Sequence, residues 1–111
     1  MNELEKNICQ LQNMIAVMTQ MFLSGKSAEP IKQYPILTQA IELILVGMIR
    51  EYQSRGIEQH ISEIEYWKVQ VTRITDAIES GDFFRVIDTL YFEMRENLDE
   101  FKKLLSENEK K

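Results

Sequence analysis

Apolar residues recur every three or four positions along the chain, in four segments that are separated by glycine. This spacing places apolar side chains on one side of an α-helix, and no segment alternates for long with the period of two that a β-strand requires. Gly25, Gly56 and Gly81 follow the first three segments, where a helix commonly ends with a residue in the left-handed conformation. The pattern therefore predicts an all-α protein with four helices.

The predicted helices are long, and most of the connections between them are short. The helices span approximately residues 3–24, 35–54, 58–80 and 82–105, and the polar tail at residues 106–111 is expected to fray. Short connections join consecutive helices as antiparallel neighbours. We therefore predict one domain, residues 1–111, folded as an antiparallel up-down four-helix bundle. A helical array that closes its core only by dimerising is the alternative architecture.

Pro35 decides where the second helix is predicted to begin. Proline suits the first turn of a helix, where its missing N–H is not required, and it disfavours a helical conformation at the preceding residue, Tyr34. Residues 25–34 are therefore expected to form the longest connection, in which Ser27 could cap a short turn.

The start of the fourth helix and a glycine within the second helix can also be predicted. Asp82 follows Gly81 directly, and aspartate is a favoured residue for capping the start of a helix. Gly47 lies inside a helical pattern rather than at its end, which indicates a close approach of another backbone.

The second predicted helix has the widest apolar face and is expected to be the most buried of the four. Ile44 lies at the centre of this face and should be fully buried. Leu43 and Val46 lie outside the face, so their side chains are expected on the surface of the bundle.

Phe92 lies on the polar side of the fourth helix. At about 100° per residue it is roughly 160° away from Met94, which belongs to the apolar stripe. Charged residues surround it on that side. A single exposed apolar residue is normal in a soluble protein, whereas an aromatic ring surrounded by charges is also a common form of interface anchor.

Composition excludes several classes of partner. The net charge is −5, from 13 basic and 18 acidic residues, and nucleic-acid affinity depends mainly on Lys and Arg contacts to phosphate. The same charge disfavours anionic membrane surfaces. The longest apolar run, residues 43–49, is far short of the roughly 20 residues that span a bilayer, and the first residues do not resemble a signal peptide. We expect a cytoplasmic protein that binds neither nucleic acid nor membranes.

The sequence contains no set of residues that predicts catalysis, a cofactor site or a metal site. A di-metal bundle requires a Glu-x-x-His motif on two helices, whereas His60 is the only histidine and Glu63 follows it in the reverse order. His60 is also the only base available to a Ser-His-Asp arrangement, and no glycine-rich loop precedes a helix to bind phosphate. Cys9 is the only cysteine and is expected to be a free thiol. The chain is therefore not expected to be an enzyme.

Two short motifs near the junction of the third and fourth helices resemble a known pattern. Ala-Ile-Glu-Ser-Gly-Asp-Phe at residues 77–83 is followed by Asp-Thr-Leu-Tyr-Phe-Glu-Met at residues 88–94. This region resembles an uncharacterised family of bacterial helical-bundle domains, in which a Gly-Asp-aromatic helix start precedes an Asp-x-Leu-x-Tyr-Glu-Leu run. Phe92 stands where that family has Tyr, and Met94 stands where it has Leu. The resemblance implies a helical fold and no particular activity.

The function that the sequence favours is that of a non-enzymatic protein-interaction module, such as an adaptor, a small chaperone or a regulator. Its partner would be another protein or a second copy of the chain, and a homodimer is the expected assembly. The candidate interface residues lie outside the main apolar stripes. They are Phe92, Leu43, Val46, Met14 and Met21.

The alternative function is a helical bundle that binds a small molecule or a metal. Such a bundle requires an internal pocket lined by convergent polar groups. Three aromatic residues on the second and third helices, Tyr52, Tyr66 and Trp67, are where such a pocket is expected.

Overall fold

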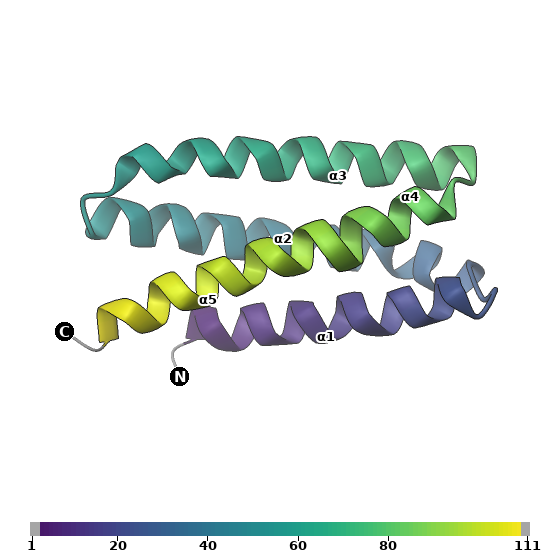
Figure 1. The fold of residues 1–111 in the computed structure, drawn as a ribbon, viewed down its shortest axis with the longest axis horizontal. Coiled ribbons are helices and arrows are strands. Elements are labelled where there is room, and N and C mark those ends of the chain that lie inside the picture. The colour runs from purple at the N-terminus through teal and green to yellow at the C-terminus, as the bar shows by residue number, and fades with distance from the viewer. Residues whose placement is uncertain (1–2, 110–111) are drawn as a thin grey trace.

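The chain is helical throughout nearly all of its length (Figure 1). The computed structural model describes residues 3–109, and no β-strand occurs in that part of the chain. The elements are α1 (Glu3–Leu23), α2 (Ala28–Ser54), the 3₁₀-helix η1 (Glu58–Ile61), α3 (Ser62–Ser80), α4 (Phe83–Ile87), the π-helix η2 (Asp88–Met94) and α5 (Arg95–Glu109). The prediction of an all-α fold is confirmed.

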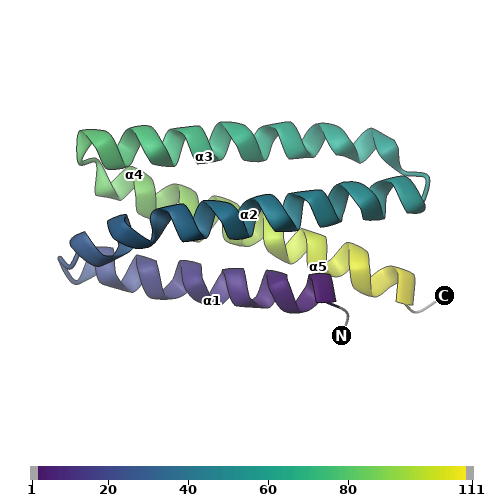
Figure 2. The same cartoon turned by 180° about the vertical axis from the view of Figure 1, so that it is seen from behind.

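Four helical rods run up and down and form an elongated bundle of 46 × 25 × 19 Å. α4, η2 and α5 follow one another without interruption, and we call this continuous helix the last rod. Each rod runs antiparallel to the one before it (Figures 1 and 2). α1 packs against α2 and the last rod. α3 also packs against α2 and the last rod, on the side of the bundle away from α1. The antiparallel four-helix bundle predicted from the sequence is therefore the observed architecture.

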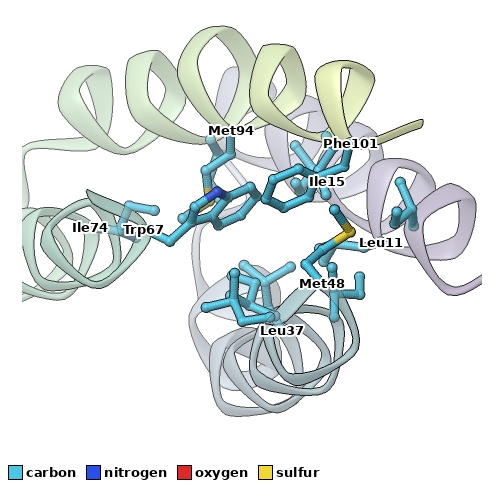
Figure 3. Close-up of a cluster of buried hydrophobic side chains, with 14 of the residues drawn as sticks. Leu11, Ile15, Leu37, Met48, Trp67, Ile74, Met94 and Phe101 are labelled. Carbon is cyan, nitrogen blue, oxygen red and sulfur yellow. The ribbon is translucent and has the colours of Figure 1, made fainter. Parts of the chain in front are cut away.

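The core lies between the inward faces of all four rods (Figure 3). Trp67 of α3 stacks on Phe101 of α5, with ring centroids 5.5 Å apart. Ile44 of α2 is 1% exposed, which confirms that it is fully buried. Aliphatic and aromatic side chains from every rod meet here, so the bundle closes its core within one chain.

The start of α2 differs from the prediction. The helix begins at Ala28 rather than at Pro35, so the connection shrinks to residues 24–27. Pro30 occupies the first turn, where no N–H is required, and Pro35 lies inside the helix on its exposed side. Pro35 has no N–H to donate to the carbonyl four residues earlier, which normally disfavours a helix interior.

Tertiary contacts next to Pro35 explain why the helix nevertheless continues. The hydroxyl of Tyr34 donates to the carbonyl oxygen of Val71, 3.1 Å away, and lies 3.0 Å from Oγ1 of Thr75. Leu37 is fully buried in the core. These contacts hold both sides of the proline against α3 and the core, and local sequence signals could not reveal them. Ser27 precedes α2, but its side chain makes no capping hydrogen bond.

The junction of α3 with the last rod agrees with the prediction. Gly81 has φ 75°, in the left-handed region that favours glycine. The carboxylate of Asp82 accepts a hydrogen bond from the backbone N–H of Arg85, 3.3 Å away. Asp82 is therefore the N-cap of α4, and the chain turns sharply at this point.

The π-helix η2 is a feature that the sequence pattern did not reveal. The buried stripe of the last rod runs through Val86, Leu90, Met94 and Leu98, which are four residues apart. On an α-helix, steps of four rotate a stripe by about 40° each, so it would turn away from the core. A π-helical turn holds more residues than an α-helical turn, and this reverses the drift. The π segment therefore keeps the stripe facing inward.

A side chain added at Gly47 would place its Cβ 2.7 Å from Cδ1 of Leu4, so the predicted close approach is made by a side chain of α1 rather than by a backbone.

α5 extends to Glu109, beyond Leu105 where the helix was predicted to end, and residues 110–111 of the predicted tail lie outside the described residues. Within residues 3–109, every helix is too short or too polar to cross a membrane.

Candidate interaction surfaces

The outer face of α2 exposes three large aliphatic side chains. Ile36 is 57% exposed, Leu43 is 69% exposed and Val46 is 48% exposed. Leu43 follows Ile36 by seven residues and Val46 follows Leu43 by three, so the three lie along one side of the helix. We call these residues the outer stripe of α2. The prediction that Leu43 and Val46 lie outside the core is confirmed.

The outer stripe exists because α2 occupies a corner of the bundle. In Figure 3 the helix that carries Leu37 and Met48 packs only its inner side against the other rods. The core face of α2 is wide, and the residues on the opposite side face solvent. Isolated exposed aliphatic residues need no explanation, whereas three on one helix face form a candidate surface for contact with another protein.

The methionine candidates on α1 are less accessible than the outer stripe. Met14 is partly buried and packs against the core. Met21 is half-buried and lines a shallow depression of about 380 Å³ together with Val17, which is 53% exposed. Val17 is therefore more exposed than Met14 and Met21, the two methionines that the sequence pattern selected on α1.

Phe92 lies on η2 and is 61% exposed. Its ring meets the ring of Tyr91 edge-on at 5.1 Å between centroids, and the guanidinium of Arg95 lies 4.9 Å from the centre of the Tyr91 ring. The predicted orientation of Phe92 away from the core is confirmed. Phe84, on α4, is 86% exposed. Phe84 also lies outside the buried stripe of the last rod, and it is a further exposed aromatic residue that was not among the predicted interface residues.

The structure does not bring Phe92 together with the outer stripe of α2. In Figure 3 the rod that carries Met94 and Phe101 lies across the core from the helix that carries Leu37 and Met48. Phe92 and Leu43 point away from the core on these two opposite rods, so they face opposite sides of the molecule. Phe92 and the outer stripe of α2 therefore belong to separate surfaces of the bundle.

The aromatic residues proposed for a ligand pocket mostly pack in the core. Tyr52 and Trp67 are each 1% exposed, whereas Tyr66 is 46% exposed. A surface cleft of about 300 Å³ lies between α3 and α5, and Tyr66, Trp67 and Phe101 are among the residues that line it. Because those two rings stack on each other, their faces are used for packing. The cleft is a surface groove and lacks the enclosed character of the predicted pocket.

Polar groups near this cleft pair with one another. The hydroxyl of Tyr52 donates to Oε2 of Glu63 at 3.4 Å, and Nδ1 of His60 lies 2.8 Å from the other oxygen of that carboxylate. Burial, together with the neighbouring Glu63 carboxylate, raises the pKa of Tyr52 well above its usual range. The Tyr52 phenol is a hydrogen-bond donor to the Glu63 carboxylate in this arrangement.

A second polar pair is buried deeper between α3 and α5. Gln70 is completely buried, and its Oε1 accepts a hydrogen bond from Nδ2 of Asn97, 3.1 Å away. Nε2 of Gln70 has no partner within residues 3–109. The pair links α3 to α5, and Asn97 also lines the surface cleft beside Tyr66.

Among the side chains that the structure describes, no group of three or more His, Cys, Asp or Glu residues is placed to hold a metal ion. Cys9 is half-buried and is a free thiol, as predicted. Comparison of the chain with protein-family models, with curated proteins and with solved structures finds no match. The family resemblance of the region from Gly81 to Met94 therefore stays an expectation.

Proposed function

We propose that the chain is a non-enzymatic protein-interaction module that binds another protein chain through the outer stripe of α2. The observation that carries the proposal is the exposure of Ile36, Leu43 and Val46 along one side of one helix. Covering such residues removes apolar surface from water, and this contributes about 25 cal/mol for each Å² buried. A helix that presents a regular apolar stripe is a common form of binding surface.

The arrangement of α2 within the bundle supports this use of the stripe. The inner face of the helix is fixed in the core by Leu37, Ile44 and Met48, all of which are almost completely buried. The backbone beneath the stripe is therefore held by the fold itself. A rigid surface loses little conformational entropy when it binds, which favours affinity.

A bundle that binds a small molecule or a metal is the second candidate function, and fewer observations favour it. The cleft beside Tyr66 is open to solvent, and the rings of Trp67 and Phe101 behind it are stacked in the core. Small-molecule sites are usually concave and enclose most of their ligand. The exposed aliphatic stripe is the more specific feature, so we favour the interaction module.

The proposal is tested by photo-crosslinking in the cell from which the protein comes. A photo-reactive phenylalanine analogue at position 43 is expected to give a discrete crosslinked product, because Leu43 is the most exposed member of the stripe. The same analogue at position 76, which is exposed on α3, is the matched control. Equal crosslinking from both positions, or none from position 43, would contradict the proposal.

A further inference from the structure

We propose that the partner of the outer stripe is a second copy of this chain, with the two α2 helices paired antiparallel about a twofold axis. This inference rests on the proposed function and adds the identity of the partner and the register of the contact. It is carried by four residues at steps of seven along the outer side of α2. They are Glu29, Ile36, Leu43 and Arg50.

These four positions lie along one line on the helix surface. Steps of seven residues make nearly two full turns, so side chains at such positions point in almost the same direction. All four residues are exposed. The line has an acidic residue at one end, a basic residue at the other and two aliphatic residues between them.

The order of these residues is complementary to itself when the helix is reversed. In a twofold dimer, if one residue contacts a second residue of the partner, the second contacts the partner's copy of the first. Placing Ile36 against the partner's Leu43 therefore also places Leu43 against the partner's Ile36. The same register places Glu29 opposite the partner's Arg50, because Glu29 and Arg50 are each seven residues beyond the central pair.

Charge complementarity distinguishes this arrangement from the parallel one. Parallel pairing in register would set each Glu29 beside the partner's Glu29 and each Arg50 beside the partner's Arg50, and like charges in contact are unfavourable. Glu29 and Arg50 make no ion pair with any side chain that the structure describes in their own chain. Both are therefore available to a partner, and the twofold axis forms each opposite-charge contact twice.

The position of the axis gives a direct test with cysteine crosslinking. The proposed axis passes midway between residues 39 and 40, and Gln39 is exposed on the outer side of α2. In a Cys9→Ser background, Gln39→Cys is expected to form a disulfide between two copies, because the two thiols lie close to the axis. Gln53→Cys is the matched control on the same helix. In the antiparallel register its two copies are displaced by about 40 Å along the helix axis, so no disulfide should form.

Charge reversal tests the register independently of crosslinking. Glu29→Arg and Arg50→Glu are each expected to weaken the dimer by about tenfold or more in sedimentation equilibrium, because each creates two like-charge contacts. The double variant should recover most of the affinity, since the charges are again opposite. Glu79→Arg and Arg73→Glu make the same changes of charge at exposed positions on α3 and should have little effect. Helical circular dichroism spectra confirm that each variant is folded.

The outcomes separate this inference from the proposed function. Disulfide formation at position 39 but not at 53, together with rescue by the double charge reversal, supports the antiparallel dimer. Disulfides at both positions, or no rescue, would overturn the register. A chain that stays monomeric at millimolar concentration overturns the second copy as partner. If photo-crosslinking from position 43 then captures a different protein, the interaction module still stands.

Discussion

Leu43 and Ile44 are neighbours in α2, yet Leu43 is 69% exposed and Ile44 is 1% exposed. Both are aliphatic side chains on the same rigid helix. The difference between them is their direction, because successive residues of a helix point about 100° apart. The inner face of α2 stabilises the bundle, whereas its outer face is available for association. The same type of residue therefore has a different role on each side of one helix.

The largest effect is expected from removing the buried member of this pair. Ile44→Ala should lower the free energy of unfolding by about 2–5 kcal/mol, because it leaves a cavity in the core. Leu43→Ala, the matched control, should change the stability of the dilute monomer by less than about 0.5 kcal/mol. Chemical denaturation at low protein concentration measures both. Equal losses for the two variants would contradict the division of α2 into a structural and an associating face.

An intermediate effect is expected at an exposed residue that acts through the backbone. Asp82→Ala should cost roughly 1 kcal/mol, because Asp82 caps the first turn of α4. The same denaturation experiment measures this loss, and Asp82→Asn should retain most of the stability, since asparagine is also a good N-cap. A loss at Asp82 beside no loss at Leu43 would show that exposure alone does not make a position neutral. An unchanged stability in Asp82→Ala would mean that the hydrogen bond to Arg85 is unimportant.

The smallest effect on stability is expected at Phe92, which is exposed on the rod opposite α2. Phe92→Ser should leave the free energy of unfolding within about 0.5 kcal/mol of the wild-type value, and it should not change dimerisation through α2. The hypothesis that Phe92 anchors a partner stays open, and it predicts that this variant loses capture of a foreign protein in a pull-down. Weaker self-association measured by sedimentation would instead place Phe92 in the interface between copies, against the α2 pairing.

Periodicity and glycine positions were sufficient to predict the four rods and their antiparallel order. Gly81 and Asp82 could be assigned correctly because both act through the local backbone. Pro35 gave a wrong start for the second helix, because the contacts that Tyr34 makes with α3 join residues that are far apart in sequence. The π-helix η2 escaped detection because a stripe with steps of four can follow an α-helix for a short distance.

The candidate surfaces were only partly predictable for a related reason. The phase of each helix correctly placed Leu43, Val46 and Phe92 outside the core. Their arrangement around the bundle depends on how the rods pack, which periodicity does not encode. Glu29 lies in the segment 25–34 that was predicted to be a connection, so its place on the same side of α2 as Ile36 and Leu43 could not be predicted. The early start of α2 is therefore what aligns Glu29 with Arg50.

The hydrogen bond between Gln70 and Asn97 favours one position of the last rod along α3. Purely aliphatic packing tolerates small slips between helices, because any apolar contact can replace another. If α5 slid along α3, Oε1 of Gln70 would lose its hydrogen bond while Nε2 already lacks a partner. A buried amide with both ends unsatisfied is strongly unfavourable. The Gln70–Asn97 hydrogen bond therefore acts mainly on specificity. It raises the free energy of bundles in which α5 is shifted along α3 more than it lowers the free energy of the native bundle.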